Sequence, residues 1–290
     1  MRRRKELKPQ KLWQKMNNLA VRTLSGIGFV IVMLAGLLVD KFLFAALVLF
    51  IMTVMMLEFY RMTIGSGYRT QQALAIAAAV IMFVLVFLNC AFHVSGKFLS
   101  LTMVPVIILM VSSLYAKDRK DFKRLSHIYT GLLYIAAPLS LVNLIAFKGG
   151  EFNAVMLLCF FVIIWCSDIG AFAVGCTIGQ KYGKKLCPAI SPKKSWAGFW
   201  GGLLFAVLAA VVLKYTGLLD LPVAHVMIMA AIMHVAGVYG DLFESQWKRA
   251  CEVKDSGNII PGHGGMLDRF DSAIFAVPAG AIYLSLLNLF

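Results

Sequence analysis

Five acidic residues in the second half of the chain lie inside or at the ends of long apolar runs. They are Asp168, Asp241, Glu244, Asp268 and Asp271. A carboxylate at membrane depth costs about 3 kcal/mol on insertion scales, so its side chain must face protein, water or a metal ion. One such residue alone could be a helix-end group bathed in interfacial water. Five that share one predicted membrane face with two basic loops favour a binding or catalytic site.

Spacing groups four of these carboxylates on two short helical faces. The first face, with positions i, i+3, i+4 and i+7 of one helix, carries Asp241, Glu244, Ser245 and Lys248. The second face is formed by Asp268 and Asp271, three residues apart at the start of the last apolar run. Hard carboxylate oxygens on consecutive helices can bind Mg²⁺. Thiolate or imidazole metal sites are not expected, because no Cys and His residues stand at ligand spacing.

A glycine-rich loop over residues 252–267 joins the two acidic faces. Gly262, Gly264 and Gly265 allow the backbone to approach an anion and to aim N–H groups at it, although a plain flexible turn has the same composition. His263 lies among them, and three roles stay open for it: general acid, phosphate donor or loop hydrogen-bonding residue.

A second basic segment lies just before the seventh apolar run and consists of Ser191, Pro192, Lys193, Lys194 and Ser195. Two ammonium groups beside a helix N-terminus suit a polyphosphate, and Ser195 is also a plausible helix N-cap. The segment is not a GxxxxGK[ST] loop, which excludes a P-loop. Oxygen ligands, basic phosphate-binding groups and a membrane location together indicate phosphoryl or nucleotidyl transfer onto a lipid.

The elements that carry these residues must be membrane helices. The chain has 290 residues, of which 60% are hydrophobic and 14% charged, and its mean hydropathy is +0.82. This composition excludes soluble, disordered, collagen-like and disulfide-built secreted proteins. Runs of about 20 apolar residues predict an all-α, polytopic membrane protein with about nine transmembrane helices. The predicted spans are 23–39, 42–60, 73–93, 98–116, 127–147, 153–175, 197–218, 222–243 and 270–289.

The net charge of +14 is mainly a signal of orientation. Of the 28 lysine and arginine residues, all but Lys41, Lys97, Lys148 and Lys214 precede the first span or lie in alternate loops on the same side. The positive-inside rule then places the N-terminus and the candidate site on the cytoplasmic side of the membrane. The membrane itself is expected to be the cytoplasmic (inner) membrane. The basic residues also attract anionic membrane lipids, and no nucleic acid is needed to explain them.

Three regions are expected along the chain. Residues 1–22 form a basic amphipathic segment, for which an interfacial helix is favoured over a disordered tail. Residues 23–147 form a five-helix membrane region that is nearly free of charge apart from Glu58, and residues 148–290 form a four-helix catalytic region. The oligomeric state is open, with a homodimer among the alternatives.

Residues 245–271 resemble the signature of the phosphatidate cytidylyltransferase, or CDP-diacylglycerol synthase, family. The resemblance rests on Ser245, Lys248-Arg249, Lys254-Asp255, Pro261, His263-Gly264-Gly265 and Asp268-Arg269-Phe270-Asp271. A second block, Asp168 to Gly175 and Ser191 to Trp196, is also similar to the family. The match covers roughly residues 168–271, while the first five spans agree only in being hydrophobic.

The resemblance implies that CTP and phosphatidic acid react to give CDP-diacylglycerol and pyrophosphate, by direct attack of the lipid phosphate on the α-phosphorus. It implies Mg²⁺ bound by Asp241, Asp268 and Asp271, with Glu244 on the same face as a further ligand, and a second cation such as K⁺ nearby. The implied catalytic residues are Asp241, Lys248, His263, Asp268 and Asp271. The implied substrate-binding residues are Asp168, Ser191, Lys193, Lys194, Ser195, Arg249, Lys254, Asp255, Gly264, Gly265 and Arg269.

The chain departs from the family pattern at two positions of the second block. Ser195 replaces a usual Thr and keeps the hydroxyl, whereas Ala197 replaces a usual Glu and removes a carboxylate. Three other interpretations stay open: a related CTP-dependent lipid kinase or cytidylyltransferase, an ion-coupled transporter with the acidic residues as its pathway, and a catalytically silent scaffold.

Overall fold

Long apolar segments fold as helices because a bilayer offers no hydrogen-bond partner to the backbone, so each segment must satisfy its own N–H and C=O groups. The computed structural model describes residues 9–115, 122–148, 150–180, 183–262 and 264–289. These residues form helices and two short hairpins, which confirms the all-α prediction. The α-helices are α1 (Pro9–Leu38), α2 (Lys41–Thr63), α3 (Arg69–Phe92), α4 (Met103–Leu114), α5 (Phe122–Gly131), α6 (Ala137–Ala146), α7 (Val155–Val174), α8 (Trp196–Tyr215), α9 (Val223–Ala250), α10 (Leu267–Phe270) and α11 (Ala273–Leu286).

Shorter elements extend or connect these helices. They are a 3-10 helix, η1 (Gly96–Thr102), two π-helical turns, η2 (Leu132–Ala136) and η3 (Gly175–Gly179), and the strands β1 (Phe147–Lys148), β2 (Glu151–Phe152), β3 (Lys185–Cys187) and β4 (Ser191–Ser195). Strand β1 pairs antiparallel with β2, and β3 pairs antiparallel with β4.

Eight helical segments of the described chain are long and apolar enough to cross a membrane, so the chain is a multi-pass membrane protein. They are Val21–Leu38, Lys41–Thr63, Arg69–Phe92, Gly96–Leu114, Arg124–Ala146, Val155–Gly179, Trp196–Tyr215 and Val223–Ala250. The ninth predicted span, 270–289, differs. Its helix is divided into α10 and α11, although Asp271 and Ser272 between them keep right-handed helical backbone angles. Helix α11 alone has 14 residues, which is about 21 Å of helix against a hydrocarbon core of about 30 Å. Asp271 Oδ1 accepts a hydrogen bond from Ser272 N between the two helices.

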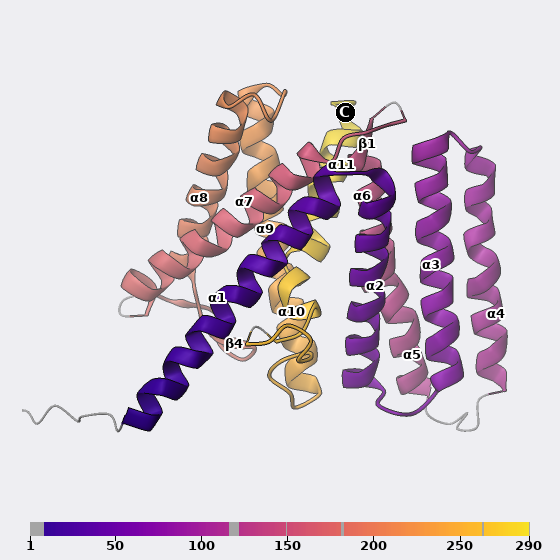
Figure 1. Cartoon of the computed structure of the whole chain (residues 1–290), viewed down its shortest axis with the longest axis horizontal. Coiled ribbons are helices and arrows are strands. Elements are labelled where there is room, and N and C mark those ends of the chain that lie inside the picture. The colour runs from indigo at the N-terminus through magenta and orange to yellow at the C-terminus, as the bar shows by residue number, and fades with distance from the viewer. Residues whose placement is uncertain (1–8, 116–121, 149, 181–182, 263, 290) are drawn as a thin grey trace, which may run out of the picture.

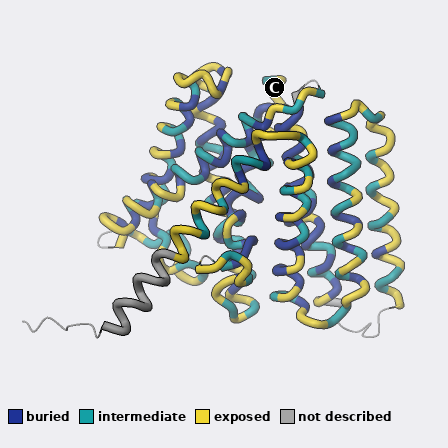
Figure 2. Tube along the Cα trace, viewed as in Figure 1, coloured by how far each residue is buried: buried dark blue, intermediate teal, exposed yellow. Residues whose placement is uncertain are grey.

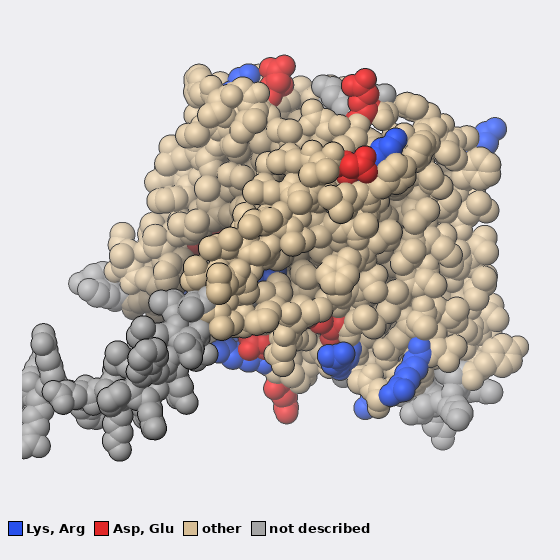
Figure 3. Space-filling view, in the orientation of Figure 1, with Lys and Arg blue, Asp and Glu red and all other residues tan. Residues whose placement is uncertain are grey.

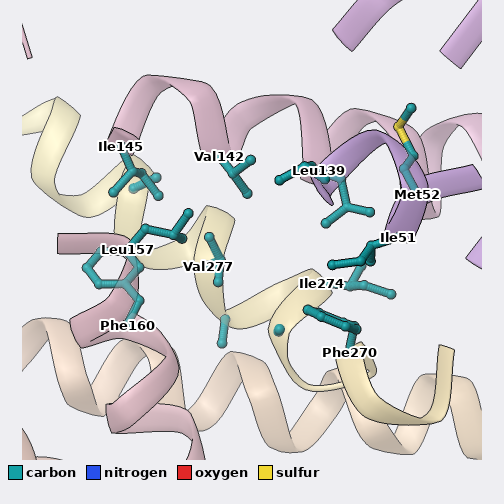
Figure 4. Packing of buried hydrophobic residues seen from close by; sticks show 14 of the residues in the cluster. Ile51, Met52, Leu139, Val142, Ile145, Leu157, Phe160, Phe270, Ile274 and Val277 are labelled. Atoms are coloured by element: carbon teal, nitrogen blue, oxygen red, sulfur yellow. The ribbon is translucent and has the colours of Figure 1, made fainter. Parts of the chain in front are cut away.

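The helices form two groups that share one core (Figure 1). Helices α2 to α5 stand side by side in one group, α7, α8 and α9 form the other, and α1 runs obliquely in front of the second group. Helix α11 packs against α9 of the second group. It also packs against α6, which in turn packs against α3 of the first group, and so it joins the two groups. Figure 4 shows Ile274 and Val277 of α11 lying among Leu139 and Val142 of α6 and Phe160 of α7.

The outer surface is apolar where lipid would contact it. Helices α1 and α4 present many exposed residues (Figure 2), and these include large apolar side chains such as Leu24 and Ile107. Charged side chains gather at the two ends of the molecule, with an apolar belt between them (Figure 3). An exposed apolar belt of this kind is the surface that a bilayer requires.

Candidate active site

The site begins with a close contact between α7 and α8. A Cβ atom on Gly198 would lie 2.9 Å from the Ala171 carbonyl oxygen, and one on Gly202 would lie 3.0 Å from that of Ser167. Glycine at these positions lets the two backbones approach, as small residues do in membrane helix pairs. Asp168 of α7 is thereby brought next to the residues that begin α8.

A cavity of about 390 Å³ lies beside this contact and collects most of the predicted site. Of the predicted residues, Asp168, Lys193, Lys194, Ser195, Asp241, Asp268 and Asp271 line it. They come from α7, the β3–β4 hairpin, α9 and α10 with the residue that follows it. Segments separated by about 100 residues in sequence therefore contribute to one cavity, in agreement with the shared membrane face expected for these residues.

The β3–β4 hairpin positions the lysines, and this hairpin was not predicted. Lys194 Nζ lies 2.6 Å from Asp241 Oδ2, so an ammonium already neutralises one carboxylate of the cavity. Ser195 Oγ accepts a hydrogen bond from Gly198 N at 3.2 Å, which confirms its predicted role as the N-cap of α8. Gln180 Nε2 donates to the Lys193 carbonyl at 2.9 Å and ties the hairpin to the end of α7 and η3.

Helix α9 continues to Ala250 and carries the first acidic face on one side, as predicted. Ser245 Oγ donates to Asp241 Oδ1 at 3.2 Å. One turn further on, Lys248 Nζ lies 2.6 Å from Glu244 Oε2 and 2.8 Å from Asp268 Oδ1. Glu244 is completely buried and does not line the cavity. Lys248 thus joins α9 to α10 as the shared cation of two carboxylates.

Asp268 is held by the glycine-rich loop as well as by Lys248. Its Oδ2 atom accepts bonds from Ser256 N at 2.9 Å, Ser256 Oγ at 3.0 Å and Gly265 N at 2.9 Å. Burial alone would raise the pKa of Asp268, but hydrogen bonds from Lys248, Gly265 and Ser256 outweigh burial and lower this pKa below its ordinary value. The loop therefore stabilises the carboxylate form.

The loop is also bound by the N-terminal helices, a contact that sequence reasoning missed. Arg22 Nε of α1 donates to the Gly262 carbonyl at 2.9 Å, and Ser25 Oγ donates to the Pro261 carbonyl at 2.9 Å. Glu58 of α2 accepts bonds from the backbone of Met266 and Leu267. A lone carboxylate in an apolar run was the single sequence signal for Glu58, and it named no partner.

A second cavity, of about 270 Å³, lies between α1 and the same carboxylates. Asp168, Asp268 and Asp271 line both cavities. The remaining wall of the second cavity is formed by Gly26, Phe29, Val30, Trp165, Ile260 and Arg269. The second cavity is thus largely apolar on the α1 side, and Arg269 is the basic residue in its wall.

Of the remaining predicted residues, those that the structure describes do not line the two cavities. Arg249, Lys254 and Asp255 are exposed, and Arg249 Nη1 donates to the Val253 carbonyl at 3.4 Å. Ser191 begins β4 but does not line the cavity. Gly264, at φ +92°, and Gly265 shape the loop around Asp268. His263 lies outside the described residues, so its role stays a prediction.

The departure at Ala197 lies next to the cavity without lining it. The Cβ atom of Ala197 lies 3.6 Å from the position that a Cβ on Gly179 would occupy. The residue is half-buried near the start of α8. The four carboxylates in the cavity are contributed by other positions.

The donor chemistry of the cavity suits Mg²⁺, because Asp168, Asp241 and Asp271 present hard oxygen atoms to one space. Asp268 and Glu244 are already paired with Lys248. Within the described ranges, no three His, Cys, Asp or Glu side chains converge closely enough to form a ready-made metal site. The residues therefore fit the ion in kind, although Asp241 is itself paired with Lys194.

Comparison with known proteins identifies the family to which the chain belongs. The chain is 36% identical over 170 residues to the phosphatidate cytidylyltransferase of Bacillus subtilis (strain 168), covering 59% of this chain and 60% of that protein. It is 37% identical over 182 residues to the enzyme of that name from Rickettsia bellii, covering 61% and 75%. A third, from Staphylococcus epidermidis, is 42% identical over 118 residues, covering 41% and 44%. The model of the cytidylyltransferase family matches residues 20–287, and the chain therefore belongs to that family.

Proposed function

We propose that the chain is a phosphatidate cytidylyltransferase, which converts CTP and phosphatidic acid to CDP-diacylglycerol and pyrophosphate. Three relatives that carry this name support the proposal. The observation that carries it is the pair of cavities that share Asp168, Asp268 and Asp271. One cavity has lysines that can bind the phosphates of a nucleoside triphosphate, and the other has an apolar wall that can contact a lipid.

In this reaction an oxygen of the lipid phosphate attacks the α-phosphorus of CTP. A new phosphorus–oxygen bond forms, and the bond from the α-phosphorus to the bridging oxygen breaks, so its electron pair leaves with pyrophosphate. Lys193 and Lys194 bind the triphosphate, while Arg269 binds the lipid phosphate from the second cavity. Bringing two anionic phosphates together requires this positive charge, because positioning and charge stabilisation supply most of the catalysis in phosphoryl transfer.

Asp241 and Asp271, together with Asp268, would hold Mg²⁺. When bound, the metal supplies charge neutralisation on the phosphates and on the pyrophosphate leaving group. Binding of the ion by Asp241 and Asp268 would replace their present ion pairs with Lys194 and Lys248. A second cation such as K⁺ stays a prediction.

The proposed location is the cytoplasmic membrane of a bacterium, with both cavities open to the cytoplasmic side, where CTP is made. The basic loops on that side support this orientation. A homodimer also stays a prediction, which crosslinking in native membranes tests.

The assay uses purified protein in phospholipid vesicles with phosphatidic acid, Mg²⁺ and CTP labelled at either the α- or the γ-phosphorus. Cytidylyl transfer moves the α-label into the lipid, whereas a lipid kinase would move the γ-label. Asp271→Asn is expected to lower turnover by about 100-fold or more, as loss of one charge-stabilising group does, while Asn keeps the shape that accepts the bond from Ser272.

The control is Asp220→Asn, an exposed carboxylate that pairs with Lys214 outside both cavities. It should have the turnover of the wild type. Folded wild-type protein that transfers neither label would refute the proposed function, and transfer of the γ-label alone would replace it with a kinase.

A further inference from the structure

Glu58 is a buried carboxylate in the second half of α2. It is 5% exposed, and it does not line either of the cavities described above. Burial of such a group is costly unless donors satisfy its oxygens. The donors come from a segment about 200 residues away in sequence, the glycine-rich loop and the start of α10.

Both oxygens of Glu58 accept hydrogen bonds. Oε1 accepts from Met266 N at 3.0 Å, while Oε2 accepts from Leu267 N at 2.9 Å and from Ser256 Oγ at 3.3 Å. The two backbone N–H groups donate to Glu58, and the single hydroxyl proton of Ser256 is shared between Glu58 Oε2 and Asp268 Oδ2. The loop is folded around this group.

Two glycines make room for the Glu58 side chain. A Cβ on Gly257 would collide with Glu58 Oε1, and a Cβ on Gly265 would lie 2.7 Å from Glu58 Oε2. Since real Cβ atoms do not approach oxygen this closely, any side chain at either position would push the loop away from α2. The glycines therefore allow the close approach of the loop backbone to this carboxylate.

The bonds of Glu58 connect directly to Asp268. The Ser256 hydroxyl lies within hydrogen-bonding distance of both Glu58 Oε2 and Asp268 Oδ2. Leu267, which donates to Glu58, is the residue before Asp268. Lys248 holds the other oxygen of Asp268. Asp268 is thus fixed from α9 on one side and, through Ser256 and Leu267, from α2 on the other.

We propose that Glu58 is a positioning residue for the reaction: it holds the glycine-rich loop and the start of α10 so that Asp268 faces the two cavities. The inference rests on the proposed function for its catalytic consequence. It assigns α2, which lies outside the two motif blocks of the sequence, a defined part in building the site.

A purely structural anchor would make a different prediction from a positioning residue. An anchor changes the fraction of folded protein but leaves turnover per folded molecule alone. A positioning residue changes kcat at fixed folded fraction and leaves substrate binding nearly intact. Hydrogen exchange of the loop, measured without any substrate, reports the position of the loop independently of activity.

The test compares Glu58→Gln with Glu151→Gln, the same chemical change at an exposed residue of the β1–β2 hairpin. In Glu58→Gln an amide NH₂ faces one of the backbone donors, so amides 256 and 265–267 should exchange faster than in the wild type. We expect kcat to fall by about 100-fold, the loss that a displacement of about 1 Å causes in a reacting group. The KM for CTP should stay within about threefold, because no binding contact is removed. Glu151→Gln should match the wild type in both measurements.

Unchanged loop exchange, or a kcat within twofold of the wild type, would overturn the proposal. If Glu58→Gln does not fold, Ser256→Ala serves instead. This variant removes one of the three bonds to Glu58, and we expect faster exchange at 265–267 and a fall in kcat of about tenfold. Wild-type exchange and rate in Ser256→Ala would equally refute it. A folded wild type that makes no CDP-diacylglycerol would instead contradict the proposed function. Hydrogen exchange of the loop in the variants would then still show whether Glu58 holds the loop in place.

Discussion

At the scale of single residues, Lys248 determines which carboxylates of the site are paired with a lysine. Its ammonium binds Glu244, four residues earlier on the same helix, and Asp268 of α10. The spacing of the first acidic face favoured Glu244 as a metal ligand, but the same i, i+4 spacing brings a lysine onto a glutamate. Spacing identifies which side chains share a face and does not decide whether an ion or an ammonium neutralises them.

Asp268 gives the protein a pH dependence of stability. Its pKa in the folded protein is lowered from 3.8 by hydrogen bonds that outweigh burial. A lowered pKa contributes stability that is fully present above the unfolded value and is lost as the pH falls through the folded value. At pH 6 the midpoint of thermal unfolding of the wild type in detergent should therefore be higher than that of Asp268→Asn.

The difference between the two proteins should shrink as the pH falls below about 4, where the unfolded chain begins to bind the proton. Thermal unfolding of both proteins at pH 6, 5, 4 and 3 measures it. A difference that grows on acidification would show that Asp268 is not stabilised as a carboxylate.

At the element scale, glycines decide how closely α7 and α8 approach. A Cβ on Gly201 would lie 2.5 Å from Val174 Cβ and 3.1 Å from the Gly170 carbonyl oxygen, so the helices would have to separate. Gly201→Ala should lower stability by about 1–3 kcal/mol, the usual range for overpacking. The measurement is the unfolding midpoint in detergent.

Gly28→Ala in α1 is the matched control. Nothing lies within 4 Å of a Cβ at Gly28, and alanine favours helix over glycine by about 1 kcal/mol. This variant should have the midpoint of the wild type or a higher one. If Gly201→Ala behaves like Gly28→Ala, the α7–α8 contact is looser than described.

Hydrophobic run length predicted the membrane helices well, because a helix that must satisfy its own backbone in lipid leaves a run of about 20 apolar residues. Run length also predicted a ninth span that is not among the eight candidate spans, because its helix is divided into the short elements α10 and α11. It also missed the β3–β4 hairpin. Strands of three and five residues, bent by an irregular register, leave no periodic pattern.

At the scale of the whole molecule, the candidate site is built by both helix groups. The shared membrane face of the carboxylates and basic loops predicted that Asp168, Lys194, Asp241 and Asp271 would meet, and one cavity contains them. The contacts of Arg22, Ser25 and Glu58 with the loop could not be predicted, because they join residues 198–240 positions apart. A single sequence carries no signal for such pairs.

Orientation in the membrane is the property of the whole molecule that the charge distribution predicts. Ser66, between α2 and α3, and Asp220, between α8 and α9, are exposed, and five of the eight candidate spans separate them. An odd number of spans places them on opposite sides, with Ser66 on the basic, cytoplasmic side. In protein whose six cysteines are replaced, Ser66→Cys should react with a membrane-impermeant maleimide in inverted vesicles only. Asp220→Cys should react in intact spheroplasts only. The reverse pattern would invert the orientation, and labelling of both from one side would mean that one of the five segments does not cross the bilayer.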